Sequence, residues 1–138
     1  MRIAYSNDRS ISIEEFIDVL NRSSLGERRP VDDRNCMKGM LQQADILITA
    51  WDREKLIGIS RSVTDFHYAC YLSDLAVDVR YQRQGIGIQM MQITQEMLGP
   101  KCNLILLAAP AAKDYYEHVG FEHNPRCWIA GRQTTIGK

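Results

Sequence analysis

The sequence comprises 138 residues, of which 45% are hydrophobic and 25% are charged. This composition is typical of a globular domain and excludes a collagen-like fibre, wholesale disorder and a membrane-spanning chain. Seventeen Lys plus Arg balance seventeen Asp plus Glu, so no net charge is available to attract nucleic acid or an anionic membrane. We therefore expect a single domain over residues 1–138, with no nucleic-acid or membrane partner.

The cysteines and the N-terminal residues indicate a cytoplasmic protein. The four cysteines lie far apart without a C-x-x-C pair, which favours free thiols over a disulfide framework or a zinc ribbon. The first eight residues lack the apolar run of a secretion signal. A metal site built from His118, His123 and Cys127 is possible on spacing, but a fourth ligand is missing, so we expect no metal.

The first half of the chain predicts two helices followed by a hairpin. Ser12-Ile13-Glu14-Glu15 has the form of a capping box, and apolar residues then recur at helical spacing. A charged connection over 25–33 leads to a second short helix over 36–41. Residues 46–51 and 56–63 are rich in apolar and β-branched side chains and flank a polar turn, which predicts two antiparallel strands.

The second half alternates between strand and helix patterns. In chain order we expect a strand over 71–79, a helix that begins near Gly85 and stops at Gly99-Pro100, a strand over 103–109, a helix over 111–119 and one or more strands from Phe121 onward. The run over 103–109 is continuously apolar, which predicts burial on both faces. A helix joins the strands over 71–79 and 103–109, so these two should be parallel. The predicted fold class is α/β, with one mixed sheet flanked by helices.

The turn before the third predicted helix carries the clearest chemical signal. Its sequence over 82–87 is Gln-Arg-Gln-Gly-Ile-Gly, and glycines at such a turn let backbone N–H groups approach a phosphate at a helix N-terminus. Arg80 and Arg83 either add positive charge there or are ordinary surface arginines. Met90 replaces the third glycine of a dinucleotide signature, and the Gly-Lys-Ser/Thr of a P-loop is absent. The turn therefore predicts a pyrophosphate cradle of another kind.

Two motifs in this sequence resemble those of the GNAT family of N-acetyltransferases. The family's acetyl-CoA signature, Q/R-x-x-G-x-G/A between a strand and a helix, is matched at every position by residues 82–87. A second family segment, A-x-x-F-Y-E-x-x-G-F, is matched by residues 112–121, with Tyr115 the only change. Both occur in the family's order with one strand between them, and the resemblance covers nearly the whole chain. The chain looks closest to small bacterial and plastid-type members that acetylate amines.

The resemblance implies acetyl-CoA as co-substrate and a primary amine as acceptor, on a small molecule or on a protein lysine or N-terminus. In the family, backbone groups of the strand before the turn hold the pantetheine arm and polarise the thioester carbonyl. A splay or bulge in that strand would leave its N–H groups free for this role. The implied cofactor-binding residues are Leu75, Ala76, Val77, Gln82, Arg83, Gln84, Gly85, Ile86 and Gly87, with Asp114 either at the cofactor or simply at a helix start.

The resemblance also assigns a general acid. Tyr116 aligns with the tyrosine that family members often use to protonate the departing thiolate of CoA. A phenol is protonated at neutral pH and can donate as charge develops on sulfur. No cysteine has a histidine partner at a known spacing, so we expect direct attack in a ternary complex and no acetyl-enzyme.

The general base is open. An amine with a pKa of about 10.4 is neutral in only about one part in 10³ at pH 7, so a base or a water relay must remove its proton. Tyr71 stands where histone-modifying members place a glutamate, which counts against their mechanism. Asp74 is the carboxylate closest to the expected thioester and is either the base or a structural group; His67 and His118 are further candidates.

Two other functions stay open beside the enzyme. One is a non-catalytic module that binds or senses acyl-CoA, which would keep the cradle without turnover. The other is a plain interaction domain in which the glycines are incidental. Trp128, near the C-terminus, could serve a homodimer contact or the core. The identity of the amine does not follow from the sequence, because variable loops form acceptor pockets.

Overall fold

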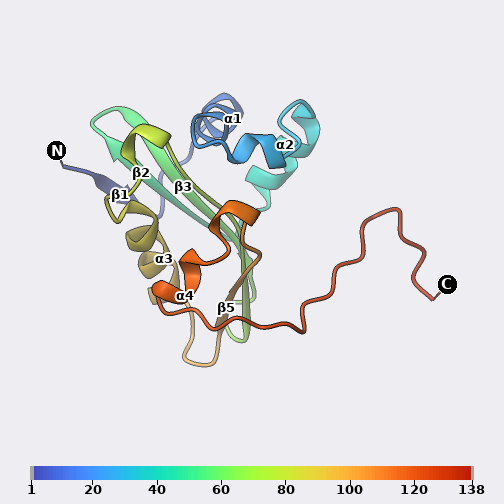
Figure 1. Ribbon diagram of the computed structural model, residues 1–138. Coiled ribbons are helices and arrows are strands. Elements are labelled where there is room, and N and C mark those ends of the chain that lie inside the picture. The colour runs from blue at the N-terminus through green and yellow to red at the C-terminus, as the bar shows by residue number, and fades with distance from the viewer. Residues whose placement is uncertain (1, 138) are drawn as a thin grey trace. The chain divides into compact units, whose positions relative to one another are not determined.

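The computed structural model describes residues 2–137, which fall into two compact units, Met1–Leu107 and Ala108–Lys138 (Figure 1). The first unit contains one mixed sheet with helices on both faces. The second contains a short helix and an extended segment. The single domain expected over residues 1–138 stays a prediction.

The sheet of the first unit has five strands in the order β1-β2-β3-β4-β5. The first four strands pair antiparallel, and β4 and β5 pair parallel. The predicted hairpin, the parallel pair and the α/β class are therefore confirmed. The strand β1 was not predicted, because three residues are too few to show an alternation. The strands are β1 Ala4–Ser6, β2 Ile46–Asp52, β3 Lys55–Thr64, β4 Ala69–Val77 and β5 Asn103–Leu106.

The helices α1 and α2 cover one face of this sheet (Figure 1). In α1, Ile13–Arg22, the Ser12 side chain accepts a hydrogen bond from the Glu15 N–H at 3.0 Å, and the Glu15 carboxylate accepts one from the Ser12 N–H at 2.9 Å. This confirms the predicted capping box. The helix α2, Arg34–Gln42, begins at Asp33, whose carboxylate accepts from the Cys36 N–H at 3.0 Å. Buried Phe16, Val19, Leu20 and Met37 form the core of this layer.

The helix α3, Ile86–Glu96, packs on the opposite face (Figure 1). Its buried residues Ile86 and Met90 pack in one hydrophobic cluster with Ile48 of β2. Gly58 in β3 allows this close approach, since a Cβ there would lie 3.2 Å from Met90 Cε. The sheet is thus covered on both faces along its centre.

The strand β5 differs from its prediction. It ends at Leu106 instead of residue 109, and it is the last strand in the sheet order instead of a strand buried on both faces. Ile105 is 49% exposed and Leu107 47%. A continuous apolar run shows that a segment can be buried, but its place in the sheet depends on partners that the run does not specify.

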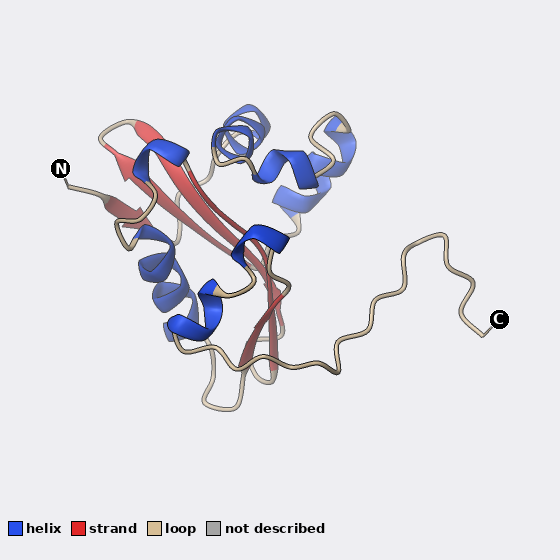
Figure 2. Ribbon diagram, in the orientation of Figure 1, coloured by secondary structure: helices blue, strands red, loops and turns tan. Residues whose placement is uncertain are grey.

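The second unit also differs from its prediction. The single helix expected over 111–119 is replaced by the 3₁₀ turn η3, Pro110–Ala112, and the one-turn helix α4, Tyr115–His118. Residues 121–137 form no strand, as the tan trace in Figure 2 shows, so the prediction of last strands from Phe121 onward is wrong. Trp128 is 92% exposed. A strand needs a paired neighbour to satisfy its backbone, and this unit contains none among its described residues.

None of the described helices has the length and apolar character that a bilayer span needs. His118, His123 and Cys127, the spacing considered for a metal, are not gathered into a ligand group in the described part of the chain.

Candidate active site

The β4 strand has an edge that is only partly paired. Its partner β5 faces it from Ala69↔Asn103 to Leu72↔Leu106 and then ends. On this side, no strand within residues 2–137 pairs with the stretch 73–77. The stretch therefore presents backbone groups that the sheet does not use. A splay or bulge that leaves N–H groups free was predicted for this strand.

A β-bulge lies where the pairing with β5 ends. On the other side of β4, Leu72 lies opposite Ser62 of β3, whereas Asp74 lies opposite Arg61, so the register shifts by one residue. Ser73 is the extra residue on β4. A bulge bends its strand and changes which edge the following residues face.

Beyond the bulge, two residues turn their backbone groups to the open edge. The Asp78 N–H donates to the Ile57 carbonyl at 2.8 Å, so Asp78 bonds toward β3. Successive residues of a strand bond to opposite edges, so Ala76 also bonds toward β3, whereas Leu75 and Val77 face the open edge. The three adjacent residues expected to bind cofactor thus differ in the direction of their backbone groups. Leu75 and Val77 direct theirs to the open edge, whereas Ala76 directs its own to β3.

The turn over 82–87 presents the N-terminus of α3 to open space. Arg83 and Gly85 both have left-handed backbones, with φ of 65° and 80°. A Cβ at Gly85 would meet no atom within 4 Å, and no side chain caps the helix. The first N–H groups of α3 therefore have no side-chain partner in the described chain and are suited to bind an anion. Gly87 lies close to β4, since a Cβ there would lie 3.7 Å from Leu75 Cδ2.

Hydrogen bonds connect this turn to the strand and the hairpin. The Gln82 amide donates to the Val77 carbonyl at 2.9 Å, and the Tyr81 hydroxyl donates to the Asp52 carboxylate at 2.7 Å. Gln82 therefore occupies one of the open-edge acceptors and fixes the turn. Arg80 and Arg83 are exposed and form no ion pair within residues 2–137, so both can meet a ligand anion.

Asp78, which was not predicted as a site residue, fixes the end of β4. Its carboxylate is 1% exposed, accepts from Arg22 Nη1 at 2.6 Å and accepts from the Arg80 N–H at 2.9 Å. Burial alone would raise the pKa of Asp78, but the hydrogen bonds from Arg80 and Arg22 lower it below its usual value. In the sequence, Asp78 lay inside the strand predicted over 71–79, which gave no reason to single it out.

Asp74, the candidate base, is fully buried. Its Oδ1 accepts from Arg29 Nε and its Oδ2 accepts from Arg61 Nε, each at 2.5 Å. Because Asp74 is out of contact with solvent and each of its oxygens already accepts from a guanidinium group, the cluster disfavours transfer of an amine proton to Asp74. This geometry favours the structural alternative for Asp74. The other candidate bases, His67 and His118, are exposed.

The second unit holds the candidate acid. The Tyr116 ring is half-buried and makes edge contacts with Tyr115 and Phe121, with centroids 5.2 and 5.4 Å apart. Burial raises the pKa of the Tyr116 phenol, and Tyr115 adds to the rise, so the hydroxyl keeps its proton at neutral pH. Asp114 precedes α4, is exposed and makes no capping bond. The roles of Tyr116 and Asp114 at the cofactor stay predictions.

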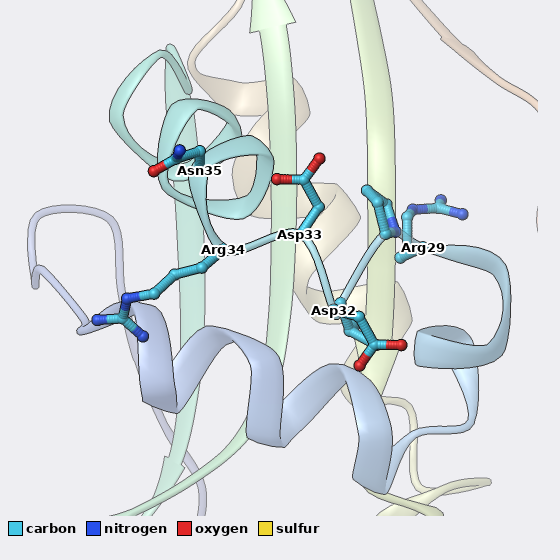
Figure 3. Close-up of a pocket in the computed structure, with 7 residues that line it drawn as sticks. Arg29, Asp32, Asp33, Arg34 and Asn35 are labelled. Carbon is cyan, nitrogen blue, oxygen red and sulfur yellow. The ribbon is translucent and has the colours of Figure 1, made fainter.

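A hollow of about 550 Å³ lies on the connection between the 3₁₀ turn η1, Leu25–Arg28, and α2 (Figure 3). Figure 3 shows its labelled side chains pointing in different directions instead of converging. A ligand pocket has convergent polar groups, so the hollow by itself does not define a binding site. Its lining consists of Arg29, Pro30, Val31, Asp32, Asp33, Arg34 and Asn35.

Comparison with known proteins identifies the family. The model of the acetyltransferase (GNAT) domain matches residues 13–127. The chain belongs to the GNAT family. The match includes both motifs, so the resemblance seen in the sequence is confirmed.

Proteins named as acetyltransferases or probable acetyltransferases resemble this chain in sequence over part of its length and in fold over most of it. A chloroplastic GCN5-related N-acetyltransferase of Arabidopsis thaliana is 32% identical over 77 residues, which are 52% of this chain and 29% of that protein. The chain spans 29% to 33% of the length of three such curated relatives. A probable acetyltransferase from meticillin-resistant Staphylococcus aureus superposes with a TM-score of 0.76 at 20% identity, covering 94% of this chain and all of that one.

A further solved structure was determined with coenzyme A. The PaiA N-acetyltransferase of Thermoplasma acidophilum superposes with a TM-score of 0.66 at 17% identity and covers 88% of this chain and 91% of that one. At these identities the two solved structures establish a shared fold.

Proposed function

We propose that this GNAT chain is an N-acetyltransferase that transfers acetyl from acetyl-CoA to a primary amine, on a small molecule or on a protein lysine or N-terminus. One observation carries the proposal: the open edge at Leu75 and Val77 leads directly into an uncapped helix N-terminus at Gly85. Family membership and the coenzyme A found with the Thermoplasma protein support the same activity.

The two features fit the two halves of acetyl-CoA. The diphosphate is anionic and suits the free N–H groups at the start of α3, beside Arg80 and Arg83. The pantetheine arm carries amides, which can pair with the open edge of β4 as a further strand would. The Val77 carbonyl is already bonded to Gln82, so the free groups for this pairing are the Val77 N–H and both backbone groups of Leu75. When bound, acetyl-CoA supplies an activated acetyl group and a thiolate that departs.

The residues of the chain then have distinct tasks. A backbone N–H of Leu75 or Val77 donates to the oxygen on which negative charge develops. The Tyr116 hydroxyl, whose proton is retained at neutral pH, donates to the departing sulfur as the C–S bond breaks and the N–C bond forms. Since Asp74 is engaged by two arginines, water takes the amine proton and passes it to solvent. The nucleophile is the amine itself, without an acetyl-enzyme.

An amine panel assayed for free thiol release tests this function. With acetyl-CoA present, at least one class among arylalkylamines, polyamines, aminoglycosides, lysine peptides and peptide N-termini should release thiol above the rate of spontaneous hydrolysis. The acetylated amine should be found in equal amount by mass spectrometry. Binding of acetyl-CoA without thiol release from any class would contradict the catalytic proposal.

That outcome would favour the second candidate function, a module that binds or senses acyl-CoA. A specific observation favours this alternative: Tyr71 stands where histone-modifying members place a glutamate, and Asp74 on the same strand is held in ion pairs. In that case the cradle binds ligand and the chain signals through a partner.

Location and assembly stay predictions. The cytoplasmic location rests on the sequence alone, and the relative from Arabidopsis thaliana is named as chloroplastic. The possible homodimer rests on the exposed Trp128.

A further inference from the structure

Asp74, Arg29 and Arg61 form a charged cluster, the Asp74 cluster, on the sheet face that carries α1 and α2. Asp74 is fully buried and Arg61 is 6% exposed. The two arginines come from different places in the chain: Arg61 lies on the adjacent strand β3, and Arg29 follows η1, 45 residues before Asp74. Such a cluster is retained in a core only where every charged group is paired and hydrogen-bonded, as it is here.

The same two arginines also hold the bulge. Arg29 Nη2 donates to the Ser73 carbonyl at 2.7 Å, and Arg61 Nη2 donates to the Ser73 hydroxyl at 3.0 Å. A guanidinium group is a planar fork that binds two acceptors at once. Each arginine therefore grips one oxygen of Asp74 and one oxygen of Ser73, the extra residue of the strand.

The bulge decides which residues face the open edge. Before the bulge, the Ala69 carbonyl accepts from the Asp65 N–H, so Ala69 bonds toward β3. With strict alternation, every second residue after Ala69 would also bond toward β3, and this series includes Leu75 and Val77. Instead, Asp78 bonds toward β3, and Val77 faces the other way. The single extra residue, Ser73, therefore exchanges which residues of β4 bond toward β3 and which face the open edge.

We propose that Arg29 and Arg61, acting through Asp74 and Ser73, are positioning residues for acetyl transfer. They hold the bulge that turns the N–H groups of Leu75 and Val77 toward the cofactor. This inference rests on the proposed function, and it gives the fully buried Asp74 a role other than that of general base.

The test compares Arg29→Met with a neighbour, Arg28→Met. Both changes remove one guanidinium group and keep a similar length, but the Arg28 side chain makes no hydrogen bond or ion pair within residues 2–137. For Arg29→Met we expect kcat to fall about 10²-fold, because a shift of about 1 Å at the reacting groups has that effect. The Kd for acetyl-CoA should rise by a smaller factor than kcat falls, since the contacts of the diphosphate with α3 are kept while the pairing of the pantetheine arm with β4 weakens. Arg28→Met should match the wild type in both.

Arg29→Lys keeps the charge but loses the fork, so its kcat should lie between those of Arg29→Met and the wild type. If Arg29→Met does not fold, Arg29→Lys is compared with the wild type in its place. A lysine variant that folds and keeps the full wild-type kcat, or a folded Arg29→Met with unchanged kcat, would overturn the proposal. A fall in kcat for Arg28→Met as large as that for Arg29→Met would also overturn the proposal.

Amide hydrogen exchange provides a readout without turnover. In the ligand-free wild type, the N–H groups of Leu75 and Val77 should exchange much faster than that of Ala76, which bonds to β3. In Arg29→Met or Arg29→Lys this difference should shrink by about tenfold or more. A wild type that shows no acetyl-CoA binding and no thiol release contradicts the proposed function. An unchanged exchange pattern in the Arg29 variants contradicts the positioning role.

Discussion

Gly85 is the residue on which the cradle depends most directly. Its φ of 80° lies in the left-handed region, and the space where a Cβ would project is open. Both facts suit a ligand that approaches the backbone closely. Sequence alone pointed to this residue because its requirement is local: a strand-to-helix turn with free N–H groups.

Gly85→Asp should abolish cofactor binding while the protein stays folded. Acetyl-CoA binds the folded state, so a saturating concentration should raise the Tm of the wild type. In the variant this shift should disappear, because a carboxylate is placed against the diphosphate at the helix N-terminus. Thermal unfolding with and without ligand measures it. Gly39→Asp in α2, where a Cβ also meets nothing within 4 Å, is the matched control and should keep the shift. An unchanged shift in Gly85→Asp would show that the diphosphate binds elsewhere.

At the scale of elements, the connection between β3 and β4 depends on one carboxylate. Asp65 Oδ1 accepts hydrogen bonds from the N–H groups of His67, Tyr68 and Ala69 at 2.8 to 3.1 Å. These bonds lower the pKa of Asp65 to about 2. The connection therefore holds the two central strands in register through a charge that only acid removes.

Asp65→Asn should lower the stability of the protein in a pH-dependent manner. The folded pKa lies below the unfolded value of about 3.9, so the charge stabilises the fold fully above that value. The contribution is lost as the pH falls from about 5 through 2. Urea unfolding of wild type and variant should show a difference at pH 7 that shrinks toward pH 2. Glu122→Gln, an exposed carboxylate in the second unit, should show no such difference. A difference independent of pH would exclude this role for the charge.

Elements were predicted best where the signal lies within one segment. The capping box at Ser12, the hairpin and the helix after Gly85 follow from residues a few positions apart. The predictions were wrong for the length and burial of β5 and for the strands expected after Phe121. There the outcome depends on whether a neighbouring strand exists, and apolar character alone does not supply one.

At the scale of the whole molecule, the candidate acid and the candidate cradle belong to different compact units. Tyr116 lies in Ala108–Lys138, whereas the open edge and the cradle lie in Met1–Leu107. The family motif around Tyr116 is the observation that connects it to the reaction.

Tyr116→Phe should lower kcat by about 10²-fold and leave the Kd for acetyl-CoA nearly unchanged, since only the proton donor to sulfur is lost. Steady-state thiol release and isothermal titration measure the two quantities. Tyr115→Phe, which removes the adjacent exposed hydroxyl, is the matched control and should keep the wild-type kcat. An undiminished kcat in Tyr116→Phe would contradict the role of the hydroxyl as acid, and the ring would then serve only packing against Phe121.

The sequence by itself determined the family and the order of most elements and predicted the place of the proposed cradle, because capping boxes, glycine turns and apolar periods depend on neighbours along the chain. Only the tertiary structure decided that Ser73 is a bulge, that Leu75 and Val77 face an open edge, and that Asp74 is held by Arg29. A bulge and an ion pair across 45 residues arise from contacts between distant segments. The alternation of residues along β4 in the sequence predicts neither the bulge nor the ion pair.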